Sequence, residues 1–311
     1  MSSEDTIAQL YAQANALREE GKEKEALALY RRILAINPHF IQAEKHIEDI
    51  LQAHERKHMQ HATLFTTKGD YEKAIREYNE LLAFNPNIWK ARKNLALLYQ
   101  KAGTMNKAII EIKKAITLAP ELCGLHLTLA KFCDIQGNYD LALEEYRKAL
   151  ELNPIDAYIQ KHTEIAEKIS AFYKERLHDT DDPFVFVDIG NLFMEKEMPE
   201  KAIELFTEAY NRAPRNQEIL YALARAHYRI KHFKKAIQLF SLALQITPPT
   251  VGLDEIYYHL GLSYSGLNNH KEAIEALTSC INVNQNGRLV SRAQATINVL
   301  QNYLKGIPNE G

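Results

Sequence analysis

Six alanines recur along the chain at a spacing built on 34 residues, and this spacing limits the possible folds more than any other feature. They are Ala26, Ala74, Ala108, Ala142, Ala202 and Ala236, and Ala273 follows as a looser seventh. The successive intervals are 48, 34, 34, 60, 34 and 37 residues, so three of them carry insertions of 14, 26 and 3 residues. A period near 34 is typical of stacked helical repeats, so we expect a repeat array.

Each of these alanines stands in a recurring context. A small residue precedes it by twelve positions, a large apolar residue follows it by four, and in six of the seven cases a proline follows it by twelve. Small residues let two helix axes approach closely, and the bulky residue fills the groove beside them. Proline ends one helix and can begin the next. A glycine recurs where a turn between two helices needs positive φ, at Gly21, Gly69, Gly103 and Gly137.

The clearest copies of this pattern run from Trp89 to Pro120 and from Leu127 to Pro154. The pattern resembles the tetratricopeptide repeat family, and seven copies cover nearly the whole sequence. The resemblance implies an all-α, right-handed α-solenoid of helix-turn-helix repeats with extra capping helices. The last copy departs from the pattern, because Gln285 stands where proline is expected. The predicted repeats are 7–40, 55–88, 89–122, 123–156, 183–216, 217–250 and 254–287.

Two insertions and the C-terminal end are expected to be helical. Neither glycine nor proline occurs from His39 to Lys68, so residues 41–54 form either an extra helix or the first part of one long helix, and the second interpretation is favoured. Residues 155–178 predict a solitary amphipathic helix, and residues 289–306 predict an end helix that covers an exposed apolar face.

The most loop-like segment of the chain lies between the fourth and fifth repeats. It runs from His178 to Pro183, and Asp182 is expected to cap the helix that starts at Pro183. This segment predicts two blocks. Residues 1–178 hold four repeats with the inserted and lid helices, and residues 179–311 hold three repeats with the end helix.

Composition narrows the class of protein. A net charge of -2 provides no basic field for nucleic acid, so no nucleic-acid partner is expected. Cys133 and Cys280 occupy repeat core positions, where a free thiol packs as a small hydrophobe, which favours a reducing compartment. The N-terminal residues show no signal peptide, and no apolar run is long enough to span a membrane. A cytoplasmic location is the resulting expectation.

One segment has the spacing of a catalytic metal motif. His54, Glu55 and His58 read H-E-x-x-H, which on a helix puts two imidazoles on one face beside a glutamate, and His61 extends the face by a turn. The two intervening residues are charged, unlike those of zinc proteases with this motif, and His58 falls at a repeat position expected to pack inside the helix pair. The sequence therefore favours no catalytic residue, no metal ligand and no cofactor.

In proteins resembling this family, the first helix of each repeat lines the concave face. Carrying those positions over gives two sets of candidate partner-binding residues. The first groove set, a basic stripe with one amide, comprises Arg56, Lys90, Lys93, Asn94, Lys101 and Lys131. The second groove set, which mixes aromatic rings with guanidinium groups, comprises Tyr221, Arg225, Tyr228, Arg229, Tyr258 and His259. Tyrosine and arginine are over-represented at binding hot spots, and a basic stripe suits an acidic partner.

These observations predict a non-catalytic scaffold or adaptor that holds an extended or helical segment of another protein in its concave groove. An acidic or amphipathic segment is the expected ligand, and an assembly factor or a chaperone-like protein would work this way. Two alternatives stay open. One is a metal-dependent hydrolase built on His54, Glu55 and His58, and the other is self-association through the apolar end helix.

Overall fold

The computed structural model describes residues 3–174 and 180–306, and within these ranges the secondary structure is entirely helical. The helices of the first four predicted repeats are α1 (Ser3–Glu19), α2 (Glu23–Ile36), α3 (Ile41–Thr67), α4 (Tyr71–Phe84), α5 (Trp89–Lys101), α6 (Met105–Leu118), α7 (Cys123–Gln136) and α8 (Tyr139–Leu152). The remaining described helices are α9 (Ala157–Lys174), α10 (Pro183–Glu195), α11 (Pro199–Arg212), α12 (Gln217–Arg229), α13 (Phe233–Ala243), α14 (Leu253–Gly266), α15 (His270–Val283) and α16 (Val290–Leu304).

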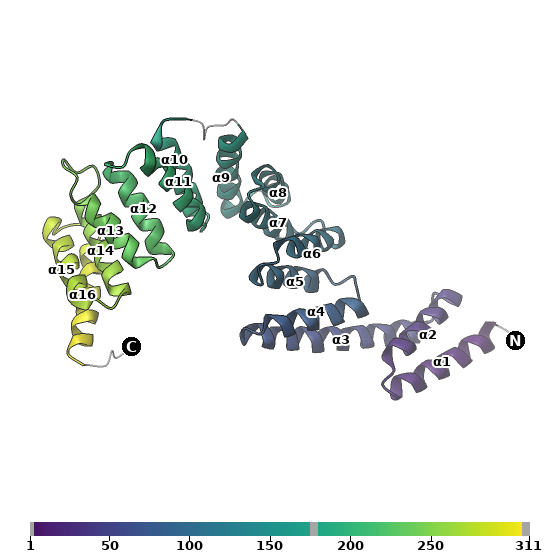
Figure 1. Ribbon diagram of the computed structural model, residues 1–311. Helices are drawn as coiled ribbons and strands as arrows, with labels where there is room; N and C mark the ends of the chain where they lie inside the picture. Colours follow the sequence, from purple (N-terminus) through teal and green to yellow (C-terminus); the bar gives the residue numbers. More distant parts are fainter. Residues whose placement is uncertain (1–2, 175–179, 307–311) are drawn as a thin grey trace. The chain divides into compact units, whose positions relative to one another are not determined.

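The described helices pack as consecutive hairpins (Figure 1), which confirms the all-α repeat solenoid. Every alanine of the 34-residue series is fully buried between the two helices of its hairpin. The predicted reason for small residues is visible at Gly190, where an added Cβ would lie 2.4 Å from the Phe206 ring. Gly261 is equally confined, because a Cβ there would lie 2.7 Å from Leu277 Cγ. The close helix crossing therefore requires a small residue opposite a bulky one.

The turns between paired helices adopt the conformation that the glycines predict. Gly21, Gly69, Gly103 and Gly137 all have φ between 72° and 80°. In the second half of the chain, Glu197, Lys231 and Asn268 take positive φ at the corresponding turns. Since a side chain costs energy in this region, glycine is preferred there without being obligatory.

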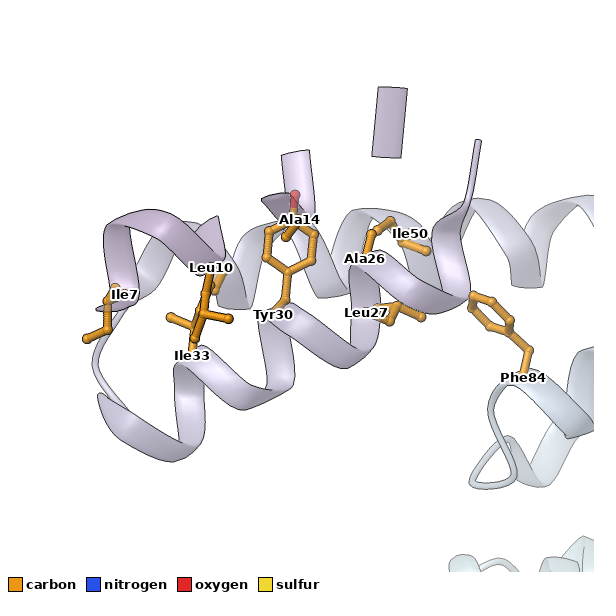
Figure 2. Packing of buried hydrophobic residues seen from close by; sticks show 10 residues of the cluster. Ile7, Leu10, Ala14, Ala26, Leu27, Tyr30, Ile33, Ile50 and Phe84 are labelled. Atoms are coloured by element: carbon orange, nitrogen blue, oxygen red, sulfur yellow. The ribbon is translucent and has the colours of Figure 1, made fainter. Parts of the chain in front are cut away.

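The insertion before the second repeat lengthens a helix, as predicted. α3 is one continuous helix of 27 residues. Its first half supplies Ala43 and Ile50 to a core formed mainly by α1 and α2, which Figure 2 shows together with Phe84 from α4. Its second half supplies Ala62 to a separate core with α4 and α5. The inserted 14 residues displace the first hairpin along α3 by about 21 Å at 1.5 Å per residue.

The chain divides into two compact units, one ending at Gln160 and the other beginning at Lys161. The boundary predicted between residues 178 and 179 lies outside the described residues and stays a prediction. In the second unit, Ile165, Ile169 and Phe172 form the buried face of α9, and the Phe172 ring meets the Phe186 ring of α10 edge-on at 5.9 Å. Asp182 caps α10 as predicted, since its side chain accepts a hydrogen bond from the Phe184 N–H.

Replacing Ala108 with leucine tests the helix packing. Ala108 on α6 has no exposed surface, so the larger side chain must force its neighbours apart at a cost of about 1–3 kcal/mol. Thermal and urea unfolding should both show this loss. The control is Ala83→Leu at an exposed position of α4, which should change stability by less than about 0.5 kcal/mol. Equal stability of the two variants would contradict the assigned core position of Ala108.

Candidate functional site

The second unit contains a groove lined by the first helices of three successive hairpins. Its volume is about 610 Å³, and α10, α12 and α14 each contribute side chains to it. The lining residues are Asn191, Met194, Glu195, Arg225, Tyr228, Arg229 and His259. The three α12 residues share one face because they are three and four positions apart. The structure thus brings together four of the six residues in the second groove set.

The two arginines give this groove its charge. Within the described residues neither Arg225 nor Arg229 forms an ion pair, and both side chains are exposed. Glu195, the one carboxylate of the groove lining, is paired with Lys161 at 2.9 Å. Guanidinium groups bind carboxylates through two parallel hydrogen bonds, so these two side chains are able to bind an acidic group.

Tyr221 and Tyr258 do not line this groove. Tyr221 is buried, and its hydroxyl donates to Glu255 Oε2 at 3.0 Å. Arg288 donates to the same carboxylate, so Glu255 is already engaged. Burial raises the pKa of the Tyr221 phenol. The centroid of the Tyr221 ring also lies 5.5 Å from the Arg225 guanidinium, and this cation–π contact helps to position the arginine side chain.

His259 is the groove residue with the most constrained surroundings. Its Nδ1 lies 2.9 Å from the Glu255 carbonyl oxygen, and its ring contacts those of Tyr228, Tyr258 and Phe240. Burial lowers the pKa of His259. A neutral imidazole that donates from Nδ1 keeps Nε2 as an acceptor. His259 therefore offers the groove a hydrogen-bond acceptor beside two guanidinium donors.

Titration of His259 and His227 makes the second unit sensitive to acid. Burial lowers the pKa of both histidines from the ordinary value of 6.5. Below that value the unfolded chain takes up protons that the folded chain resists, so stability falls as pH drops through about 6.5 and levels off below the lowered pKa values. We expect the melting temperature to fall from about pH 7.5 to about pH 5.5, with a smaller fall in His227→Gln/His259→Gln. An identical pH dependence of the two proteins would contradict this assignment.

The first groove set lies in the first unit on α3, α5 and α7. Three of its lysines lie over aromatic rings, with ammonium-to-centroid distances of 5.7 Å for Lys90 on Trp89, 5.7 Å for Lys101 on Tyr71 and 5.1 Å for Lys131 on Tyr158. Asn94 is half-buried, and its amide donates to the Tyr78 hydroxyl at 3.1 Å. Arg56 is exposed and Lys93 is half-buried. Five of these residues are basic, and Asn94 is partly engaged by the fold itself.

The H-E-x-x-H segment does not assemble as its spacing suggests. The rings of His54 and His58 do stack, 5.3 Å apart, but His54 Nε2 lies 2.8 Å from Glu23 Oε2 and His58 Nδ1 lies 2.7 Å from Glu77 Oε2. The carboxylates whose oxygens lie within 4.8 Å of a His58 ring nitrogen, and of each other, are those of Glu77 and Glu80 on α4. Glu55 does not belong to this cluster. The fold therefore does not bring His54, Glu55 and His58 together as one catalytic centre.

Sequence reasoning missed a polar pair that recurs in three hairpins. The fourth residue of the repeat faces the twenty-third, as His58 with Glu77, Arg92 with Glu111 and His126 with Glu145, and each pair is 2.7 Å apart. The corresponding pair in the sixth repeat is apolar, Leu220 with Leu239, and is buried. In the sequence, these pairs appear as two polar residues 19 positions apart, and this interval recurs every 34 residues.

Two cysteines behave as core residues. Cys133 and Cys280 are buried, and burial raises the pKa of each thiol to about 11. A thiol with a raised pKa is a poor nucleophile and a poor metal ligand at neutral pH, which confirms their assignment as packing residues.

Comparisons with known proteins identify partial relatives. The photosystem I assembly protein Ycf3 of Prochlorococcus marinus (strain NATL2A) is 32% identical over 96 residues, which cover 28% of this chain and 54% of that protein. The Ycf3 protein of strain NATL1A is 31% identical over the same length. The chain thus spans about half the length of the curated relatives it matches.

The comparison with solved structures identifies several proteins of low similarity to this chain. The TPR domain of P58(IPK) has a TM-score of 0.38 at 19% identity, with coverage of 97% of this chain and 80% of that one. YrrB, described as a TPR protein with an unusual peptide-binding site, has a TM-score of 0.35 at 16% identity, with coverage of 70% and 97%. MamA has a TM-score of 0.32 at 19% identity, with coverage of 62% and 91%. In the described part of this chain, no helix has the length and apolar character that crossing a membrane requires.

Four profiles described as tetratricopeptide repeat match the sequence from the second hairpin onward. They cover residues 59–122, 123–156, 193–251 and 254–286, which is more than half of the chain. The matched ranges take in the second part of α3 with α4 to α8, and the end of α10 with α11 to α15. By its repeat period, its helix packing and these matches, the chain belongs to the tetratricopeptide repeat family.

Proposed function

We propose that this protein is a non-catalytic scaffold that holds an acidic segment of a partner protein, and that the α10–α12–α14 groove is its principal binding site. The observation that carries the proposal is a groove of about 610 Å³ that presents Arg225 and Arg229, neither of which has an ion-pair partner among the described residues. Tetratricopeptide repeat proteins generally serve as protein–protein interaction scaffolds.

The other groove groups complete a site for a peptide rather than a lone anion. Tyr228 offers a half-buried ring, Met194 offers an adaptable apolar contact, and Asn191 offers an amide that can pair with a peptide backbone. Aromatic and arginine side chains in a concave site are the usual centres of binding energy. An acidic segment with an apolar residue nearby would match both the charge and the surface of this groove.

The basic residues of the first groove set would contribute through steering. Lys90, Lys93 and Lys101 lie on α5, a helix without an acidic residue. Exposed charges accelerate the encounter with an acidic partner more than they tighten the final complex. The curated relatives are named as photosystem I assembly proteins. This name supports a chaperone-like or assembly function for this scaffold.

Affinity purification from native lysate, followed by mass spectrometry, tests this function. The wild type is compared with Arg225→Glu/Arg229→Glu and with Lys93→Glu/Asn94→Ala/Lys131→Glu. The control, Lys234→Glu/Lys235→Glu, makes the same charge change on exposed residues of α13, the second helix of the same hairpin as α12. We expect one partner to be retained by the wild type and the control and lost by Arg225→Glu/Arg229→Glu. Equal recovery by all four proteins would contradict the proposal.

Self-association is a second candidate, because the end helix exposes apolar side chains. Val299, Tyr303 and Leu304 of α16 are 48%, 66% and 50% exposed. Sedimentation at increasing concentration would show a dimer, and Val299→Glu/Leu304→Lys should abolish it. A monomer at all concentrations in the wild type would remove this candidate.

A further inference from the structure

The His58–Glu77 pair belongs to the series of polar pairs in three consecutive hairpins. In the third and fourth repeats a lysine completes the arrangement, since Lys114 lies 2.7 Å from Glu111 and Lys148 lies 3.0 Å from Glu145. Glu111 is thus held between Arg92 and Lys114, and Glu145 is held between the His126 imidazole and Lys148. A contribution to the stability of the hairpin is enough to explain a polar pair of this kind.

The second repeat departs from this arrangement at two positions, and both departures introduce metal-ligating side chains. Glu80 stands where the next two repeats have Lys114 and Lys148. His61 stands where they have the buried Leu95 and Leu129. There are thus two differences: glutamate replaces lysine at position 80, and histidine replaces leucine at position 61. Together with His58 and Glu77, they give the second repeat a cluster of two imidazoles and two carboxylates.

The long helix explains why a histidine is tolerated at this position. The first hairpin packs against the inserted half of α3, because Ala43 and Ile50 belong to the core around Tyr30. Figure 2 shows Ile50 in this core. The surface of the second half, where the preceding hairpin would otherwise pack, is left open, and the His61 side chain is 48% exposed. Residue 61 is therefore free of the packing that buries Leu95.

The geometry of the cluster suits a divalent transition metal. One ligand atom each from His58, Glu77 and Glu80 lies within 4.8 Å of the other two. His58 Nδ1 is 2.7 Å from Glu77 Oε2 and 3.9 Å from Glu80 Oε2. His61 lies outside this group of three, and its Nδ1 is 3.5 Å from the same Glu77 oxygen. Neighbouring ligand atoms in a tetrahedral zinc site are about 3.3 Å apart, for bonds of about 2.0 Å.

We propose that His58, His61, Glu77 and Glu80 form a binding site for one divalent transition-metal ion of the zinc class. Imidazole nitrogen and carboxylate oxygen are both zinc ligands, and two carboxylates balance the charge of the ion. The ion would take the place of the hydrogen bond between His58 Nδ1 and Glu77 Oε2. It would clamp α3 to α4 at the point where the first hairpin is offset along α3.

Zinc binding by the full-length, untagged protein tests this site, by competition with a chromophoric chelator and by calorimetry. The test variant is His61→Leu/Glu80→Lys, which restores the residues of the next two repeats and keeps the His58–Glu77 pair. The control is His39→Leu/Glu72→Lys, which makes the same changes of residue type and charge at exposed positions outside the cluster.

We expect one zinc ion per chain in the wild type and the control. Loss of two ligands should weaken binding by at least about 100-fold, since loss of an outer-shell partner alone costs about 10–100-fold. Zinc should also raise the melting temperature of the wild type and leave that of the test variant unchanged. Should the test variant fold poorly by circular dichroism, Glu80→Gln supplies the same comparison. Equal zinc affinity in the wild type and the folded variant, or no stoichiometric binding in the wild type, would overturn the proposal.

Discussion

Reversing the charge of Arg225 and Arg229 together should weaken binding of an acidic partner segment by about 100-fold or more. Each guanidinium can form charge-assisted hydrogen bonds worth about 1.5–3 kcal/mol, and each introduced carboxylate would repel the ligand. Neither arginine forms an ion pair within the described residues, so the substitutions break no described ion pair of the fold. Fluorescence polarisation with acidic peptides selected on the wild-type protein measures the effect.

Two controls separate groove recognition from general electrostatics. Lys234→Glu/Lys235→Glu should leave the affinity nearly unchanged, because both lysines lie on the second helix of the hairpin. Arg225→Lys/Arg229→Lys keeps the charge and removes the two-pronged hydrogen bonding, so an intermediate loss is expected. If all three double variants bind equally well, the arginines do not recognise the ligand.

Replacing Glu145 alone with leucine should destabilise the first unit by about 1–3 kcal/mol. Glu145 and His126 are both buried, with His126 Nδ1 2.7 Å from Glu145 Oε2 and Nε2 3.1 Å from the Pro120 carbonyl oxygen. Removing the carboxylate leaves a buried imidazole nitrogen without its partner. Urea unfolding monitored by circular dichroism measures the loss.

The double replacement His126→Leu/Glu145→Leu should recover most of that stability. It reproduces the buried Leu220–Leu239 pair of the sixth repeat, and replacing both partners of a buried hydrogen bond by apolar groups can be nearly neutral or stabilising. His126→Arg should also be tolerated, because Arg92 already donates to both Glu111 and the Pro86 carbonyl oxygen in the preceding repeat. A double variant as unstable as Glu145→Leu would refute this account of the pair.

The sequence predicts the helix hairpins because local physics and long-range packing impose the same period. Buried Ala142 and positive-φ Gly137 were both predictable, since a close helix crossing and a tight turn each restrict the residue type. The single α3 helix followed from the absence of glycine and proline over its length. These features depend on one residue type at a time, which a sequence displays directly.

The candidate sites were less predictable, because they depend on which side chains meet. Tyr221 occupies a groove position in the repeat register, but the structure buries it against Glu255, 34 residues further on. The H-E-x-x-H spacing places His58 beside Glu55 of the same helix, whereas the fold pairs it with Glu77 of the next helix. Local spacing identifies residues that share a helix face, and only the packing of two helices identifies their partners.

Site-specific photocrosslinking tests the central claim most directly. A photoreactive amino acid replaces Tyr228 in the groove in one protein and exposed Lys234 on α13 in the other. Both proteins are irradiated in native lysate, and the adducts are identified by mass spectrometry. A partner that binds in the groove should crosslink from position 228 and not from position 234, at an acidic segment of its sequence. Crosslinking from position 234 alone would place the partner on the opposite helix of the hairpin and would contradict the groove as the binding site.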